Sequence, residues 1–394
     1  MKRLKKILIR TILIGLAFCL IIIVITSTTG FQIQTNPMEH FFSQHEQIDS
    51  LSLNDSIPKQ LVIDDINYLT NTIEEVHPDP YHSNTKEEFD YLADSIIHSI
   101  CTDISREDLL KKLIPLLKSI NDGHTTIKFP EISKGQDNQS NFIKAHADSV
   151  EIVAFDNLNE STGYIFIKDF TMGKNNFKEK LEYIFKQIQE DSLTNLIIDI
   201  RNNPGGNSEL ADILTSYVYD KPYKANSKII LKRSEQYYSY VRGYFFWWFR
   251  PFLGFIKQIK DYKNTSVGGI YEDVKGNKNP ISTQHQFNGK KYLLINSNTF
   301  STALGFATVF KDYNMGVIIG EPTKSEVNEF GDIYPFDLPN SGLWVWCSAK
   351  RYIRPSGDMT EGGLKPDIIV KDENDEILKY SIDLIGNQRG RTNH

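Results

Sequence analysis

The stretch Leu196-Ile-Ile-Asp-Ile-Arg-Asn-Asn-Pro-Gly-Gly206 joins two kinds of local structure. Its first half is a short, mostly apolar run of the kind found in strands buried within a parallel sheet. A Pro-Gly-Gly turn follows, and a helix can begin at Asn207. The two glycines permit positive φ and leave backbone N–H groups uncovered, and at a helix start such groups suit a developing negative charge. The stretch predicts a strand–turn–helix unit; a plain structural turn is the other interpretation.

The segments on both sides of this unit alternate between strand and helix in the same way. Short apolar runs are followed by apolar residues at helical spacing. This order predicts an α/β domain with a largely parallel sheet, in which sites form beyond the carboxyl ends of the strands. The predicted strands are 164–167, 196–200, 292–295 and 317–319, and the predicted helices are 177–188, 210–217 and 302–310.

The chain has 394 residues, 40% of them hydrophobic and 24% charged, which is enough for more than one domain. Before the α/β part, Thr85 and Ser105 each precede an acidic residue by three positions, as in a capping box, and apolar residues follow at helical spacing. We therefore predict a helical domain. The predicted boundaries are 58–130 for the helical domain, 131–372 for the α/β domain, with a loop-rich connection at 131–160 and an aromatic insertion at 222–288, and 373–394 for a C-terminal tail.

The insertion centres on Tyr237–Phe255, where aromatic residues are dense. Three interpretations remain open for it: an aromatic packing element or lid core, an apolar wall for a substrate, and a contact with a membrane interface, where Trp and Tyr are favoured.

The first 30 residues differ in kind from the rest. Five basic residues among the first ten precede an uncharged run, Thr11–Ile25. Counted from Ile7, the nearly apolar span approaches the roughly 20 residues that cross a bilayer. Because a basic flank stays inside, the remainder is expected outside the cytoplasm, in a periplasmic or extracellular location. We predict a retained signal anchor at 1–30 and a spacer at 31–57; a cleaved signal peptide with secretion is the alternative.

Several classes of partner are not expected. A net charge of −6 with no large basic face argues against a nucleic-acid partner. The chain contains neither C-x-x-C nor H-E-x-x-H, so no metal or cofactor is predicted. His77 and His82, in the stretch HPDPYH, are interpreted as part of a Pro-rich turn rather than as ligands. Whether Cys101 and Cys347 pair is left open.

Three further turns can carry chemistry. Asn121-Asp-Gly-His-Thr-Thr126 places His124 directly after a predicted helix. Ile295–Ala303 places Ser301 where a strand ends and a helix begins, as in a nucleophile elbow, although G-x-S-x-G is absent; an N-cap serine is the alternative. In Thr360–Asp367, Glu361 precedes a Gly-Gly pair, a pattern that is also typical of a surface turn.

Taken together and in order, five segments resemble the S41 serine peptidases. This family includes the carboxyl-terminal processing proteases, the tricorn protease core and the repeats of the interphotoreceptor retinoid-binding protein. The resemblance covers most of residues 60–370 and implies a sheet domain similar to the crotonase and ClpP folds. Only about 30 residues separate Pro130 from the strand at Tyr164, too few for a PDZ domain, so the chain resembles the branch that lacks one. The five segments are NDGHT, LIIDIRNNPGG, INSNTFSTA, GEPT and EGGLKPDIIV.

The resemblance implies roles for individual residues. Ser301 matches the nucleophile. His124 matches the base of the tricorn-like branch, and Glu361 matches the carboxylate that orients it. The oxyanion hole is implied to consist of backbone N–H groups, one from Gly205 or Gly206 and one from Thr302.

Two departures from the family pattern bear on these roles. The processing proteases use a lysine as the base, but Glu326 stands at that position and Lys324 is displaced by two residues. In the tricorn pattern a serine precedes the histidine and links it to the glutamate, but this chain has Gly123. We therefore expect Glu361 to reach His124 directly, or through Thr125 or a water.

The sequence thus predicts a serine endopeptidase that hydrolyses peptides or unfolded proteins through an acyl-enzyme. Two alternatives remain. One is a binding protein that keeps the fold without peptidase activity, since the aromatic insertion can line an apolar ligand site. The other is a crotonase-like acyl chemistry, for which the sequence shows no coenzyme A site. Oligomeric state is not predicted.

Overall fold

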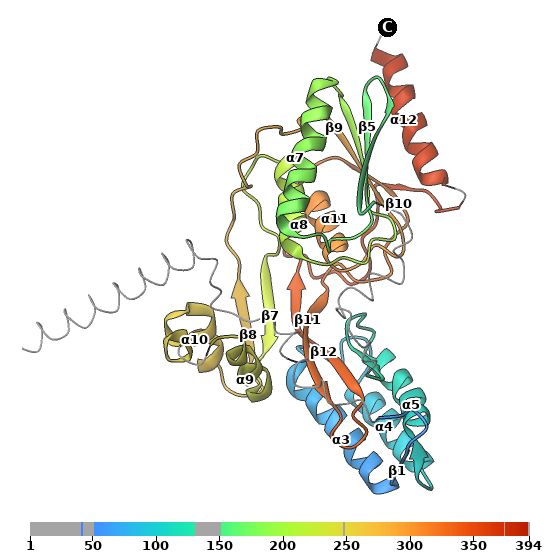
Figure 1. Ribbon diagram of the computed structural model, residues 1–394, viewed down its shortest axis with the longest axis vertical. Helices are drawn as coiled ribbons and strands as arrows, with labels where there is room; N and C mark the ends of the chain where they lie inside the picture. The colour runs from blue at the N-terminus through green and yellow to red at the C-terminus, as the bar shows by residue number, and fades with distance from the viewer. Residues whose placement is uncertain (1–40, 42–50, 131–150, 247–248, 374, 393–394) are drawn as a thin grey trace, which may run out of the picture.

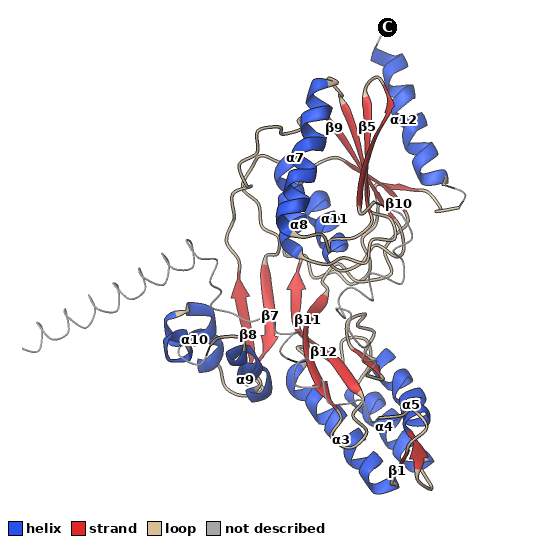
Figure 2. Cartoon of the chain, viewed as in Figure 1, coloured by secondary structure: helices blue, strands red, loops and turns tan. Residues whose placement is uncertain are grey.

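The computed structural model describes residues 41, 51–130, 151–246, 249–373 and 375–392. In these residues two separate sheets dominate, one above the other in Figure 1, and helices pack on each of them. Figure 2 shows the upper sheet enclosed by helices and the lower sheet flanked by two groups of helices. The α/β class predicted from the sequence is confirmed for the upper sheet, whereas the lower sheet was not predicted.

The upper sheet follows the order β13-β10-β9-β6-β5-β4. All neighbouring pairs are parallel except β4 with β5. The strands predicted from apolar runs lie here. However, β4 falls inside the segment that we predicted to be loop-rich, so that prediction is wrong for this part; its burial alternates only weakly, as expected of an edge strand. The strands are β4 (Val153–Asn159), β5 (Thr162–Ile167), β6 (Asn195–Asp199), β9 (Lys290–Ile295), β10 (Val317–Gly320) and β13 (Ile368–Ile369).

Helices cover both faces of the upper sheet (Figure 1). On one face α7 (Lys174–Glu190), α8 (Ser208–Val218) and α11 (Thr302–Asp312) bury their apolar stripes in a single core. On the other face α12 (Glu376–Thr392) buries Ile377 and Ile385. Each such aliphatic side chain contributes about 1.5–3 kcal/mol when fully buried. The C-terminal segment, which we predicted only as a tail, is therefore mostly a helix that completes the core.

The lower sheet is antiparallel and is assembled from distant segments. Its order is β11-β12-β7-β8, and β3 pairs with β12 at Trp344–Trp346. This pairing is important for the site, because it ties the turn that carries His124 to β12. The strands are β3 (Thr126–Lys128), β7 (Lys228–Lys232), β8 (Ile270–Val274), β11 (Phe330–Asp337) and β12 (Trp344–Ile353).

The helical domain lies against this lower sheet, and the two share one core. Both bonds of the capping box predicted at Thr85 are present, and the Ser105 hydroxyl accepts a hydrogen bond from the Asp108 N–H group. These caps satisfy N–H groups that a helix start otherwise leaves unpaired. The elements are β1 (Ser56–Ile57), α3 (Lys59–Val76), α4 (Lys86–Ser99), β2 (Ile104–Ser105) and α5 (Arg106–Lys118).

The aromatic insertion adds β7 and β8 to the lower sheet and three short helices beside it. The helices are α9 (Glu235–Gly243), the 3-10 helix η1 (Arg250–Phe255) and α10 (Lys257–Asn264). Tyr237, Tyr238 and Tyr262 are buried in the core shared with the helical domain. For these residues the packing interpretation of the insertion holds.

No helix within the described ranges is long and apolar enough to cross a membrane. The predicted anchor at 1–30 and most of the predicted spacer at 31–57 lie outside these ranges.

Candidate active site

Ser301 occupies a sharp turn between β9 and α11. Its backbone angles are φ 52° and ψ −128°, a combination that L-residues rarely adopt. Such a conformation costs about 1–3 kcal/mol and persists only where the surroundings enforce it. The side chain makes no capping hydrogen bond to α11. Ser301 therefore stands at the N-cap position without capping the helix through its side chain, and the hydroxyl is available for another partner.

That partner is His124. The Nε2 atom of His124 lies 3.1 Å from the Ser301 Oγ atom, which is hydrogen-bonding distance. The ring of His124 stacks on Phe300, with 4.5 Å between the ring centroids. The structure thus brings together two residues that are 177 positions apart in the sequence.

Gly123 leaves room for the Phe300 ring. A Cβ atom at position 123 would lie 2.8 Å from that ring, closer than real Cβ contacts allow. A larger residue there would have to shift the ring that stacks on His124.

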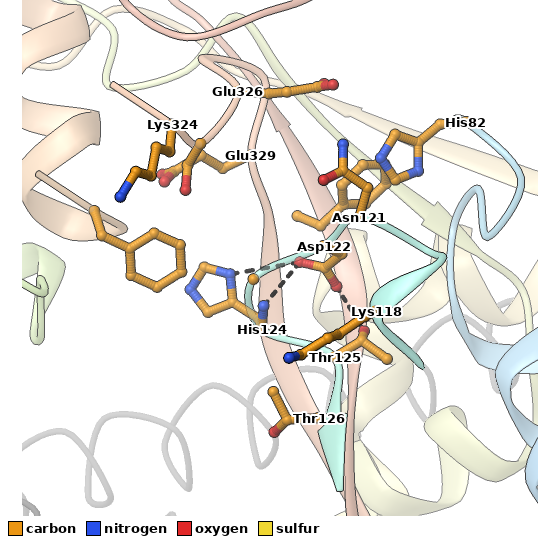
Figure 3. A pocket seen from close by; sticks show the side chains of 14 residues that line it. His82, Lys118, Asn121, Asp122, His124, Thr125, Thr126, Lys324, Glu326 and Glu329 are labelled. Atoms are coloured by element: carbon orange, nitrogen blue, oxygen red, sulfur yellow. Dashed lines mark hydrogen bonds and ion pairs between the residues drawn. The ribbon is translucent and has the colours of Figure 1, made fainter. Parts of the chain in front are cut away.

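The carboxylate beside His124 belongs to Asp122. Its Oδ1 atom accepts the His124 backbone N–H at 3.0 Å and lies 3.7 Å from the ring Nδ1 atom. Its Oδ2 atom accepts the Thr125 hydroxyl at 2.6 Å. Thr125 in turn accepts the Ser348 N–H of β12 at 3.0 Å, which fixes the turn to the lower sheet. Figure 3 shows Asp122 between His124 and Thr125.

A second histidine, His77, also contacts Asp122. His77 is fully buried, and its Nε2 atom lies 3.4 Å from the Asp122 Oδ2 atom. Its Nδ1 atom accepts the Asp79 N–H at 3.2 Å. Since Nδ1 is thereby the acceptor, we assign the ring proton to Nε2, which donates to Asp122. Burial lowers the pKa of His77 despite the nearby carboxylate.

These hydrogen-bond donors favour the ionised form of Asp122. Burial alone raises the pKa of a carboxyl, but the hydrogen bonds and electrostatic attraction of His124 and His77 outweigh it. The pKa of Asp122 therefore lies well below its usual range. A permanent negative charge beside Nδ1 is what a histidine base needs when it takes up a proton at Nε2.

Glu361 is not brought to His124, contrary to our expectation. It lies on an exposed turn, which backbone contacts hold in place: Val327 N–H donates to the Gly362 carbonyl, and Glu326 forms a bridge with Gly363. No hydrogen bond or ion pair joins the Glu361 carboxylate to any described residue. The structure places Asp122 where we expected Glu361.

The Pro-Gly-Gly turn lies directly against the nucleophile. A Cβ atom on Gly205 would be 2.7 Å from the Ser301 Cβ atom and 2.8 Å from the Thr302 nitrogen. The Gly205 N–H is already used, since it donates to the Asn203 side chain at 2.9 Å. The N–H groups of Gly206 and Thr302, by contrast, have no hydrogen-bond acceptor among the described residues. The Thr302 hydroxyl donates to the Gly206 carbonyl at 2.6 Å and holds the two segments together.

Lysine does not take the place of the histidine. Among the described residues no lysine contacts Ser301. The Nζ atom of Lys324 donates to Asn298 at 3.3 Å, and Glu326, at the family's lysine position, lies 3.8 Å from Arg351. The described residues contain no group of three His, Cys, Asp or Glu side chains that could hold a metal ion.

A pocket of about 380 Å³ opens beside the Ser301–His124 pair. It is bounded by the turn after α5 on one side and by the segment before β11 on the other (Figure 3). Both polar and apolar side chains line it. The lining residues are His82, Lys118, Asn121, Asp122, Gly123, His124, Thr125, Thr126, Phe300, Lys324, Ser325, Glu326, Glu329 and Phe330.

Comparison with known proteins agrees with this geometry. A model of peptidase family S41 matches residues 161–370, more than half of the chain. The chain belongs to peptidase family S41. Membership of this family makes the protein a serine peptidase, a hydrolase. No curated protein matches the sequence significantly.

Solved structures show the same fold. A candidate peptidase from Parabacteroides merdae aligns with a TM-score of 0.59 and 17% identity, covering 83% of this S41 chain and 96% of the other. A mutant of CPAF aligns with a TM-score of 0.60 and 13% identity, covering 81% and 94%. At such low identity these similarities establish the fold but not the substrate.

Proposed function

We propose that this S41 peptidase is an endopeptidase that acts through an acyl-enzyme, with Ser301 as the nucleophile, His124 as the base and Asp122 in place of Glu361 as the orienting carboxylate. The observation that carries the proposal is the 3.1 Å contact between the Ser301 hydroxyl and the His124 Nε2 atom. It occurs at a strained turn, where stored strain is typical of a functional residue.

The chemical steps follow from this geometry. Ser301 Oγ attacks the peptide carbonyl carbon while His124 Nε2 takes its proton. The imidazolium is then paired with Asp122. The C–N bond breaks as His124 returns the proton to the leaving amine, and an ester on Ser301 remains. Water repeats the sequence and releases the acid.

The negative charge on the carbonyl oxygen needs donors in place before the reaction. Thr302 N–H and Gly206 N–H fit this role, because Thr302 follows Ser301, Gly206 is hydrogen-bonded to the Thr302 hydroxyl, and neither N–H has an acceptor within the described part of the chain. One such donor lowers the barrier by about 3–4 kcal/mol. Gly205 is better suited to close packing, since its N–H is already used.

The test compares wild type and Ser301→Ala, both as the full chain in detergent, with a mixed peptide library and an unfolded protein. Mass spectrometry reports the cuts. We expect cuts with wild type only, together with labelling of Ser301 by a fluorophosphonate. Equal cleavage by Ser301→Ala would sink the assignment of the nucleophile.

We also propose that the N-terminal segment tethers the peptidase outside the cytoplasm. The support is the sequence: basic residues at the start and the uncharged run Thr11–Ile25. Alkaline extraction of membranes is expected to leave the full chain in the pellet and to release a chain that begins at residue 31. Release of both chains would contradict a retained anchor.

A further inference from the structure

Glu329 is a carboxyl group at the nucleophile that the reaction above does not use. It immediately precedes β11, and its Oε1 atom accepts the backbone N–H of Ser301 at 2.9 Å. It also lines the pocket beside the Ser301–His124 pair (Figure 3). Its position, 28 residues after Ser301, is not one that the sequence marks out.

The bond to Glu329 meets a need that the turn creates. Ser301 immediately precedes α11 and lies in the turn after β9, which ends at Ile295, so neither element supplies an acceptor for its N–H. An N–H group left without an acceptor away from water is unfavourable. The Glu329 carboxyl supplies the acceptor at a residue whose own backbone is strained. It also leaves Thr302 N–H, rather than Ser301 N–H, to face a developing oxyanion.

The surroundings of Glu329 disfavour a charge. Among the described residues, no cation forms an ion pair with it, and the anionic Asp122 is nearby. Burial raises the pKa of Glu329 well above its ordinary value; the Ser301 N–H lowers it by less, and Asp122 raises it further. The titratable and charged groups that line its pocket or act on it are His82, Lys118, Asp122, His124, Lys324, Glu326 and Tyr352.

We propose that Glu329 is a positioning residue that holds the Ser301 turn through a neutral carboxyl group, and that its ionisation sets the alkaline limit of activity. A neutral acceptor fixes the Ser301 amide without placing a negative charge beside the oxyanion. An ionised Glu329 would still accept the N–H, but its charge would repel the oxyanion. Activity should therefore fall as pH rises through the raised pKa of Glu329. This inference rests on the proposed serine peptidase function.

Two substitutions separate the acceptor from the charge. Glu329→Gln keeps an Oε1 acceptor and is neutral at every pH, whereas Glu329→Leu has a similar size and no acceptor. For Glu329→Gln we expect kcat within about threefold of wild type at neutral pH and an alkaline limb that moves up or disappears. For Glu329→Leu we expect a loss of about 10–100-fold in kcat with little change in KM, as befits one lost hydrogen bond of about 1–3 kcal/mol.

The readouts are kcat and KM from pH 5 to 10 for the full chain, and the rate of Ser301 labelling by a fluorophosphonate. Glu326→Gln is the matched control, because it neutralises the other glutamate of the pocket; its alkaline limb should be that of wild type, whatever its kcat. The inference is overturned if Glu329→Leu keeps the wild-type kcat, if Glu329→Gln loses as much as Glu329→Leu, or if Glu329→Gln keeps the wild-type alkaline limb.

Failure of the underlying function has a different signature. A folded wild type that neither cleaves peptides nor labels at Ser301 overturns both proposals. A wild type that labels and cleaves, with variants at position 329 that behave like it, overturns only the role of Glu329.

Discussion

Asp122 and Glu329 hold the Ser301–His124 pair from two different parts of the fold, and their electrostatic surroundings are opposite. Asp122 lies on the turn that leaves the helical domain and accepts hydrogen bonds from His124, Thr125 and His77. Glu329 lies on the segment that enters the lower sheet, and among the described residues its carboxyl group accepts a single one, from Ser301. The pKa of Asp122 is well below its ordinary value, and that of Glu329 is well above it.

The difference shows that burial alone does not decide the charge of a carboxyl group. Burial raises the pKa of both groups, but only Asp122 has enough donors to outweigh it. The consequences suit the two halves of the reaction. The anion lies next to the base, which becomes a cation, and the neutral carboxyl lies next to the nucleophile, where an oxyanion forms.

The largest effect is expected from removing the charge of Asp122. Asp122→Asn keeps the size of the side chain, but its amide nitrogen must face donors such as the Thr125 hydroxyl or His77 Nε2. The loss of imidazolium stabilisation and of the correct ring tautomer should lower kcat by about 10²–10⁴. Steady-state kinetics with a peptide substrate measure this loss.

The rate of Ser301 labelling by a fluorophosphonate serves as a second readout for Asp122→Asn, since it needs the base but no peptide binding. Circular dichroism shows whether the variant is folded. A folded Asp122→Asn protein with normal kcat and labelling would mean that the carboxylate beside His124 is only structural.

A smaller effect is expected from removing one donor to Asp122. His77→Phe keeps an aromatic ring against Phe330, whose centroid lies 4.7 Å from that of His77, but it removes the Nε2–H donor. We expect about a tenfold loss in kcat with KM little changed, in line with one hydrogen bond to a charged group. A folded His77→Phe protein with the wild-type kcat would argue that His77 only fills space.

The sequence predicts best those parts of the fold that local patterns determine. The strand at Leu196–Ile200 and the helix after it follow from an apolar run and a turn within a few residues. The lower sheet does not, because β3 and β12 pair across more than 200 residues and neither carries a decisive local pattern. The strand β4 was also not predicted, because its partly exposed residues resemble those of a loop.

The candidate site divides in the same way. Ser301 and His124 stand at turns between predicted elements, where their residue types are informative. Asp122 lies in the same turn as His124, yet an aspartate before glycine is an ordinary turn residue. Its role depends on His77, which is 45 residues away. HPDPYH was interpreted as a turn, and nothing local shows that one of its histidines is buried against a carboxylate.

The smallest effect is expected from Glu361, the carboxylate that the family resemblance implied. It is exposed and makes no contact with His124, so Glu361→Gln should change kcat and KM by less than about twofold, as for most surface substitutions. Glu361→Gln and Asp122→Asn both change a carboxylate to an amide in the same protein, but only Asp122→Asn is expected to lower kcat strongly. A large loss of kcat for Glu361→Gln would mean that the exposed turn closes onto His124 when substrate binds. In that case the comparison of Asp122 with Glu329 would describe only the resting enzyme.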